Sequence, residues 1–256
     1  MCGIAGFTDT NNCIRDPSHL IQNITASLAH RGPDDSGFLL DTDAHVFLGH
    51  RRLSIVDLNT GQQPIHNEDR SIHVIANGEI YNFKKLKTEL EHKGHFFYTK
   101  SDCEVLVHLY EEHGINFVDK LEGMYAFAIW DQKQKKLCLA RDRYGEKPLY
   151  YFFKNNDLFF ASELKALLKC PCIRKELDII ALQKYLAYEY IPAPLSIIKD
   201  VFKLDAAEIL EYDLVQNRVS KSKYWLPFAN PPSSLVLNFD QAKNRFESLL
   251  VAAIEK

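Results

Sequence analysis

The chain has 256 residues, of which 46% are hydrophobic and 25% charged, and its formal net charge is -3. These values are ordinary for a globular protein and exclude a disordered or fibrous chain. The charges carry no electrostatic footprint for nucleic acid, so no nucleic-acid partner is expected. No apolar run is long enough to span a membrane and no signal peptide is recognisable, so we expect a cytoplasmic protein without membrane contact.

Cysteine usage indicates neither a disulfide framework nor a metal centre. The six cysteines are Cys2, Cys13, Cys103, Cys138, Cys170 and Cys172. Without a secretion signal they are expected to be reduced thiols. Cys170 and Cys172 are closely spaced, but no second pair and no paired histidine motif completes a set of four ligands. We therefore expect no metal site.

The chain begins Met1-Cys2-Gly3, which offers a self-contained nucleophile. Removal of Met1 would place a thiol and a free α-amine on one residue. Ordinary pKa values of about 8.5 for the thiol and about 7.7 to 8 for the amine would let the amine accept the thiol proton near neutral pH. The alternative is an inert cysteine that merely follows the start methionine. The apolar run 4–7 is typical of a strand that could hold this terminus in a sheet.

The next segments are expected to be a helix, a loop and a hairpin. Asp16 and Pro17 are typical of a helix start, and apolar residues follow at helical spacing. Residues 30–37 are rich in Gly, Pro and Asp and predict a loop. The apolar runs 38–40 and 46–48 predict a hairpin.

Arg52 is expected to lead into a strand over 53–58, where apolar and polar residues alternate. An arginine held by a strand can bind a carboxylate through two parallel hydrogen bonds, which suits an amino-acid ligand. The alternative is a surface arginine in a solvated ion pair.

Residues 72–76 predict an apolar strand that ends at Asn77-Gly78. Such a pair at a strand end is usually a tight turn, which makes a plain hairpin one interpretation. In the other interpretation, the Asn77 amide and the Gly78 backbone N–H are two donors of the kind that form an oxyanion hole.

A short amphipathic helix is expected before Gly94, and a second helix begins shortly after it. Ser101 and Glu104 match the capping box that opens such a helix. Asp102 falls in the first turn, where the helix dipole stabilises an anion. The same carboxylate could hold an ammonium group, provided that Arg52 holds a carboxylate nearby.

The remaining chain predicts a large antiparallel β system. Strands are expected at 124–130, 136–140, 149–153, 158–161, 201–204 and 208–212, and helices at 163–168 and 177–188. Continuous and alternating apolar strands together imply stacked sheets covered by helices, an α+β fold. We expect one domain over 1–212, followed over 213–256 by a linker and the first helix of an incomplete second domain. Residues 240–256 are expected to form a helix, and its apolar face suggests that the rest of the second domain is missing.

Laid out in order, these segments resemble the N-terminal glutaminase half of glutamine-hydrolysing asparagine synthetases, a class II glutamine amidotransferase domain of the N-terminal-nucleophile hydrolases. The matching stretches are Cys2-Gly3-Ile4, His30-Arg31-Gly32-Pro33-Asp34, Arg52-Leu53-Ser54-Ile55-Val56-Asp57, Asn77-Gly78-Glu79-Ile80-Tyr81-Asn82, Ser101-Asp102-Cys103-Glu104, Leu121-Glu122-Gly123-Met124, Ala140-Arg141-Asp142 and Ala161-Ser162-Glu163. The resemblance implies a four-layer αββα sandwich of two antiparallel sheets.

The resemblance also implies a reaction. Cys2 would attack the side-chain amide of glutamine, release ammonia and leave a γ-glutamyl thioester that water hydrolyses. Asn77 and Gly78 would form the oxyanion hole for this step.

The substrate would be held by its amino-acid head. Arg52 would bind the α-carboxylate, and Asp102 with Glu79 would take the α-ammonium. Main-chain groups of four further residues would line the same pocket: Leu53, Ser54, Ile55 and Val56.

In the family, a second domain uses ATP to activate aspartate and receives the ammonia. Its Ser-Gly-Gly-x-Asp-Ser signature does not occur in this sequence. We therefore expect no cofactor for the glutaminase step, and ATP with Mg only for the missing synthetase domain. The expected partners are glutamine, a separate synthetase domain or subunit, and a second copy in a homodimer.

Three other interpretations stay open from the residues alone. One is a glutaminase that serves another acceptor, such as a sugar phosphate or an amino acid other than aspartate. Another is a truncated, non-catalytic remnant with a binding or regulatory role. The third is a cysteine hydrolase with His50 or His30 as its base, which is disfavoured because the α-amine already supplies one.

Overall fold

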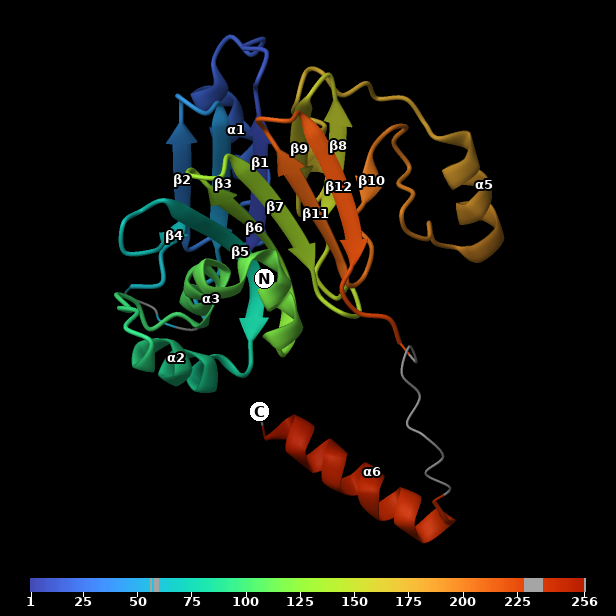
Figure 1. The fold of residues 1–256 in the computed structure, drawn as a ribbon. Helices are drawn as coiled ribbons and strands as arrows, with labels where there is room; N and C mark the ends of the chain where they lie inside the picture. Colours follow the sequence, from blue (N-terminus) through green and yellow to red (C-terminus); the bar gives the residue numbers. More distant parts are fainter. Residues whose placement is uncertain (56, 58–59, 228–236, 256) are drawn as a thin grey trace. The chain divides into compact units, whose positions relative to one another are not determined.

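The computed structural model describes residues 1–255 except 56, 58–59 and 228–236. The described chain forms two compact units, Met1–Tyr224 and Trp225–Lys256. Within the larger unit the strands form two antiparallel sheets (Figure 1). Among the described residues, no helix combines the length and apolar character that a membrane crossing requires.

The first sheet has β1 near its centre. Its strands are β1 (Gly3–Thr8), β2 (Asp35–Asp41), β3 (Val46–Arg52), β8 (Tyr150–Lys154), β9 (Asp157–Ala161) and β10 (Phe202–Lys203). They lie in the order β10-β8-β9-β1-β3-β2. Because β1 is paired on both sides and covered on both faces, all six of its residues are buried. This fixes the position of the chain start.

The second sheet is built around β5 and β6. Its strands are β4 (Ile65–His66), β5 (Ile72–Ile80), β6 (Gly123–Asp131), β7 (Lys136–Arg141), β11 (Glu208–Asp213) and β12 (Arg218–Lys223). They lie in the order β12-β11-β7-β6-β5-β4. The larger unit also has the helices α1 (Pro17–Ala26), α2 (Phe83–His92), α3 (Val105–His113), α4 (Leu164–Leu167) and α5 (Ile179–Tyr188), and the 3-10 helices η1 (Asp102–Glu104) and η2 (Gly114–Lys120).

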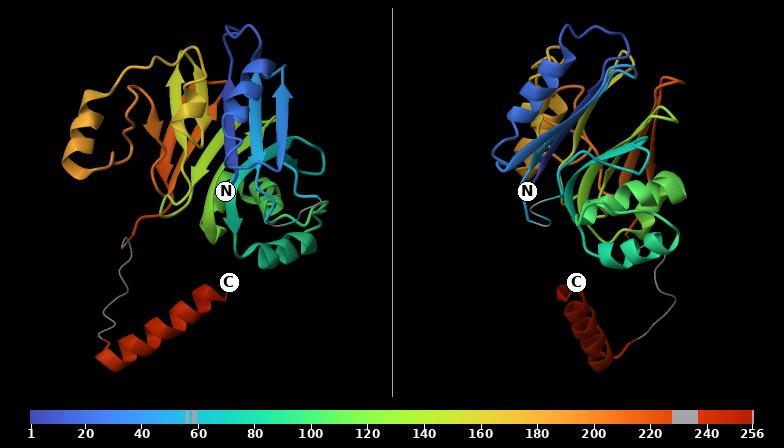
Figure 2. Two further views of the ribbon diagram at one scale, coloured as in Figure 1. Left: turned by 180° about the vertical axis from the view of Figure 1, so that it is seen from behind. Right: turned by 90° about the vertical axis from the view of Figure 1, so that its left-hand side faces the viewer.

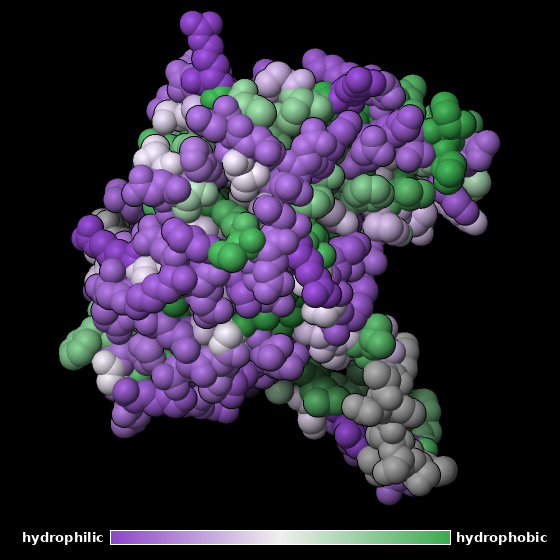
Figure 3. Space-filling model, turned by 45° about the horizontal axis from the view of Figure 1, so that its top comes forward, coloured by the Kyte–Doolittle hydropathy of each residue, from purple (hydrophilic) through white to green (hydrophobic). Residues whose placement is uncertain are grey.

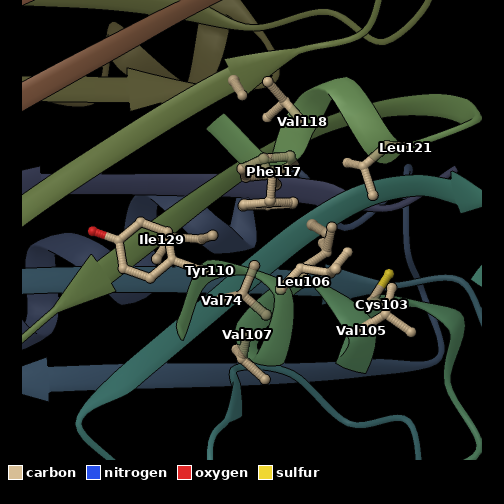
Figure 4. Packing of buried hydrophobic residues seen from close by; sticks show 14 of the residues in the cluster. Val74, Cys103, Val105, Leu106, Val107, Tyr110, Phe117, Val118, Leu121 and Ile129 are labelled. Carbon is tan, nitrogen blue, oxygen red and sulfur yellow. The ribbon is translucent and has the colours of Figure 1, made fainter. Parts of the chain in front are cut away.

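Three apolar clusters separate the four layers. The cluster between the sheets includes Leu48 and Trp130. A second cluster packs α1 and α4 onto the outer face of the first sheet, and a third packs α2, α3 and η2 onto the second sheet. The right-hand view of Figure 2 shows this stacking, and Figure 4 shows Leu106 and Phe117 beside Val74 of β5. The expected αββα sandwich is confirmed.

Several local predictions hold because their signals are local. Helix α1 begins at Pro17, and the Asp16 side chain accepts the His19 backbone N–H at 2.9 Å, as a helix cap does. The hairpin of β2 and β3 is present, although β2 already begins at Asp35 within the stretch expected to be a loop.

Two predictions near the pocket are wrong. Strand β3 ends at Arg52 and no strand follows over 53–55, because the pairing partner β2 begins at Asp35, which lies opposite Arg52. Asn77-Gly78 is not a turn, since β5 continues to Ile80 and pairs with β6 throughout. A strand is defined by its partner, and the sequence pattern did not reveal where each partner ends.

The capping box at Ser101 forms only in part. The Ser101 hydroxyl accepts the Cys103 backbone N–H at 3.2 Å, and a 3-10 turn precedes α3. The Glu104 carboxylate instead accepts the backbone N–H groups of Tyr98 and Thr99 at 2.8 and 2.7 Å. The Glu104 side chain therefore binds the segment before the helix and not the Ser101 backbone N–H that a capping box would use.

The larger unit continues to Tyr224, beyond the boundary expected at residue 212. The difference arises from β12, an exposed and polar edge strand that pairs with β11 and resembles a linker in sequence. Within the stretch expected to be a linker and first helix, residues 228–236 lie outside the described residues. In the second unit, α6 (Phe239–Ile254) forms with Asn238 and Gln241 as a capping box, where a helix was expected.

Candidate active site

The Cys2 main chain is held at the entrance to β1. Its carbonyl accepts the Arg31 Nε–H at 2.9 Å, and the Arg31 guanidinium is paired with Glu163 at 2.9 Å. The Cys2 Sγ lies 3.4 Å from the Leu53 N and 3.7 Å from the Leu53 O. Arg31 belongs to a motif noted in the sequence, but its role in positioning the cysteine was not foreseen.

Burial raises the pKa of the Cys2 thiol. The hydrogen bond from Leu53, the positive N-terminus and Arg52 act in the opposite direction and only partly offset it. The thiol is therefore neutral at pH 7, and a nearby base must remove its proton before it can act as a nucleophile.

A pocket beside Cys2 brings most of the expected site residues together. It is lined by Cys2, Arg52, Leu53, Ile55, Gly61, Gln63, Ala76, Gly78, Glu79, Ser101, Asp102 and Cys103. Ser54 and Asn77 do not line it. The Ser54 backbone N–H donates to the Asp34 carboxylate at 2.7 Å. Val56 lies outside the described residues.

Arg52 lies at one side of the pocket, at the end of β3, and is only 5% exposed. Its guanidinium donates to the Asp57 carbonyl. A Cβ on Gly61 would come within 2.6 Å of the Arg52 Nη2, so only glycine leaves room for the guanidinium in this position. The role of Gly61 was missed, because its turn gave no sign of where Arg52 points.

Two carboxylates, Asp102 and Glu79, line the same pocket. The Asp102 Oδ2 accepts the Ile80 backbone N–H at 2.7 Å, which fixes its orientation. Burial raises the pKa of Asp102, and burial together with the Asp102 charge raises the pKa of Glu79. Burial disfavours the charged form of both carboxylates, so a bound cation would stabilise that form.

Asn77 is 1% exposed, and neither atom of its amide has a hydrogen-bond partner among the residues that the structure describes. A buried amide without a partner costs free energy, so such a group is usually kept for a function. The neighbouring residue, Gly78, is required by its packing against β6. A Cβ there would lie 2.2 Å from the Met124 O of β6, which no side chain tolerates.

Neither histidine considered as a base is arranged for that role. His50 is buried, its Nε2 donates to the Ala76 carbonyl at 3.1 Å, and burial lowers its pKa to about 3. The ring of His30 contacts the Glu163 carboxylate at 2.9 Å and the Lys165 Nζ at 3.1 Å. These contacts indicate structural roles for both rings.

The fold is shared with two solved structures. The chain superposes on the Bacillus subtilis glutamine phosphoribosylpyrophosphate amidotransferase with a TM-score of 0.63 and 20% identity, over 88% of this chain and 50% of that one. A structure described as the allosteric regulatory enzyme of purine biosynthesis gives a TM-score of 0.64 and the same identity and coverage. At this identity the match defines the fold.

The sequence defines the family. Residues 1–225 match the model of the glutamine amidotransferase domain, and the chain belongs to this family.

Relatives share up to about half of the aligned residues. This chain is 42% identical over 236 residues to the glutamine-hydrolysing asparagine synthetase 2 of Bacillus subtilis, and the match covers 88% of this chain and 30% of the relative. It is 48% identical over 171 residues to synthetase 3 of Arabidopsis thaliana, covering 65% and 28%. An amidase of Gibberella zeae, chry2, is 40% identical over 66% of this chain and 26% of the relative. The chain thus spans about a third or less of the length of these relatives.

Proposed function

We propose that this chain hydrolyses glutamine to glutamate and ammonia through a γ-glutamyl thioester on Cys2, and that the ammonia normally serves ATP-dependent conversion of aspartate to asparagine. The observation that carries the proposal is the single pocket that joins Cys2 with Arg52 and the two carboxylates of Glu79 and Asp102. A thiol beside groups that complement an α-carboxylate and an α-ammonium suits an amino acid whose side chain reacts.

The proposed reaction begins after removal of Met1. The α-amine of Cys2 accepts the thiol proton, and the sulfur attacks the side-chain carbonyl carbon of glutamine. The oxygen of the tetrahedral intermediate gains negative charge, and the Asn77 amide and the Gly78 N–H donate to it. The C–N bond then breaks, and the amine returns its proton to the departing ammonia. Water hydrolyses the thioester, which releases glutamate and restores the thiol.

Recognition of the amino-acid head selects a free α-amino acid in this proposal. Arg52 forms two parallel hydrogen bonds with the α-carboxylate, and Asp102 with Glu79 binds the α-ammonium. The main chain around Leu53, which already contacts the Cys2 sulfur, lines the path between head and side chain. No cofactor takes part in this step.

The acceptor of the ammonia is proposed to lie in a synthetase domain, with ATP and Mg bound there. The names of the asparagine synthetase relatives and their greater length support this part of the proposal. In this proposal, the second unit, Trp225–Lys256, is the start of the synthetase domain. The amidase relative favours a second candidate, a glutaminase that serves a different acceptor.

The surface of α5 supports a protein partner. Apolar side chains on and beside this helix are more than half exposed, among them Ile179 at 61% and Leu186 at 75%. Figure 3 shows them gathered at the end of the larger unit that carries α5. We propose the acceptor domain as the occupant, and a second copy in a homodimer as the alternative. A cytoplasmic location belongs to the proposal and fits the six free cysteines.

The deciding experiment measures ammonia release from glutamine by the purified chain. Cys2→Ala is expected to abolish release without changing the far-UV circular dichroism. Cys13→Ala, which alters an exposed thiol outside the pocket, is the matched control and should retain full activity. Mass spectrometry should show that Met1 is absent from the active protein. Activity that survives Cys2→Ala would rule out the thioester, and an inactive but folded parent chain would favour the non-catalytic alternative.

A further inference from the structure

Two histidines and two glutamates from separate segments converge beside α3. Glu68 precedes β5, His95 follows α2, and His108 and Glu111 belong to α3. One ligand atom from each of these residues lies within 4.8 Å of the others. We propose that they form a structural site for a divalent transition metal, and that zinc is the ion it holds.

The spacing of these atoms fits a tetrahedral ion. The Nδ1 of His108 lies 3.3 Å from the Glu111 Oε2 and 3.5 Å from the Glu68 Oε2. The Nδ1 of His95 lies 3.6 Å from the Glu111 Oε2 and 3.4 Å from the Glu68 Oε1. Zinc bonds of about 2.0 to 2.2 Å place neighbouring tetrahedral ligands about 3.3 to 3.6 Å apart. The four histidine–glutamate distances fall in that range, and one ligand atom from each residue lies within 4.8 Å of the others.

Both imidazoles also have an outer carboxylate. The Nε2 of His95 lies 3.3 Å from the Glu112 Oε1, and the Nε2 of His108 lies 3.8 Å from the Glu104 Oε1. A histidine that binds a metal through one nitrogen usually donates its other N–H to a carboxylate, which fixes the tautomer. Both rings are turned in this sense, with Nδ1 toward the shared centre and Nε2 toward the outer group.

His108 is the buried member of the cluster. Its side chain is fully buried, and its Nε2 lacks a hydrogen-bond partner within the described part of the chain. A metal at Nδ1 would fix the proton on Nε2, which faces the buried Glu104 carboxylate at 3.8 Å. The bound metal would thus explain the orientation of the His108 ring and the position of the Glu104 carboxylate beside it.

The ligands are held from outside the cluster. Asn67 donates to the Glu111 Oε1 at 2.8 Å, which leaves the other oxygen for the centre. The Phe96 backbone N–H donates to the Glu68 Oε1 at 2.9 Å. Glu68 and Glu111 have side chains 35% and 27% exposed, so solvent and an ion can reach the site.

The ligand set selects the class of ion. Two imidazoles and two carboxylates suit zinc, whereas Mg²⁺ and Ca²⁺ prefer sites made of oxygen alone. The two carboxylates balance the charge of the ion. Binding would join the segments before β5 and after α2 to α3, whose preceding turn carries Asp102 of the pocket. The site would stabilise that wall of the pocket without taking part in the reaction.

The test is zinc binding by the whole chain after treatment with a chelator, followed by equilibrium dialysis and metal analysis. About one equivalent is expected, with affinity reduced at least tenfold in both His95→Gln and Glu111→Gln. His92→Gln, at an exposed histidine close in sequence to His95, is the matched control and should bind normally. Both ligand variants alter partly exposed residues and keep side-chain length or shape, so we expect them to fold. They test the proposal without a change at His108, whose side chain is fully buried.

Cobalt distinguishes this site from the cysteines. Co²⁺ should give the absorption of a tetrahedral ion without a thiolate charge-transfer band, and the same spectrum should persist when Cys170 and Cys172 are replaced by serine. Absence of bound zinc at micromolar concentrations would overturn the proposal. So would zinc that remains bound in both ligand variants, or that is lost in the cysteine variants. Glutaminase activity does not enter any of these readouts.

Discussion

Replacing Asn77 with Ala separates the function of this side chain from its contribution to stability. Both polar atoms of the amide are buried and unpartnered among the described residues. Removing an unsatisfied buried group recovers about 1 to 3 kcal/mol. The lost volume of about 25 Å³ costs about 0.6 kcal/mol at about 24 cal/mol per Å³ of cavity. The variant should therefore be as stable as the parent or more stable, by up to about 2 kcal/mol.

Activity should respond in the opposite direction. Loss of one oxyanion donor is expected to lower kcat by about 10²- to 10³-fold, because the interaction is made only in the transition state. The KM for glutamine should change little. Urea unfolding and the rate of ammonia release measure the two effects on the same protein.

Asn67 provides the control. It is also 1% exposed, but its amide nitrogen donates to Asp69, Ser71 and Glu111 and its oxygen accepts the Ile72 N–H. Asn67→Ala should lose roughly 2 to 4 kcal/mol of stability and keep its kcat. The reasoning fails if Asn77→Ala retains kcat within about threefold, or if it loses more than about 2 kcal/mol, since the amide would then have a native partner.

Two further predictions concern the ends of the substrate. Gly61→Ala would place a Cβ 2.6 Å from the Arg52 Nη2 and displace the guanidinium. The KM for glutamine should therefore rise at least tenfold, while stability changes little. An unchanged KM in steady-state kinetics would show that Arg52 does not bind the carboxylate. Glu79→Gln should raise both the Tm at pH 7 to 8 and the KM. Because the folded pKa of Glu79 is raised, its charge opposes folding above the ordinary pKa of about 4.3. The gain in Tm over the parent should therefore vanish as the pH falls below that value, and a gain that persists at pH 3 would refute this account.

The sequence by itself determined the elements whose signals are local. Asp16 and Pro17 predicted the start of α1, and the apolar run after Cys2 predicted β1. Motif resemblance also identified residues that the structure gathers into one pocket, although they come from four separate stretches of chain. Such motifs can be recognised because each is contiguous.

Tertiary structure decided everything that depends on a distant partner. It placed Arg52 at the end of a strand rather than the beginning, because β2 begins at Asp35. It left the Asn77 amide inside a strand without a partner among the described residues, and it placed the Arg52 guanidinium against Gly61.

The proposed zinc ligands show the same limit most clearly. Glu68, His95 and the α3 pair are separated by 13 or more positions, and none forms a recognisable spacing with another segment. Only the packing of α2 and α3 onto the second sheet brings them together. Local patterns specify which element a residue belongs to, whereas the atoms that it meets are set by contacts distant in sequence, and these exist only once the layers have assembled.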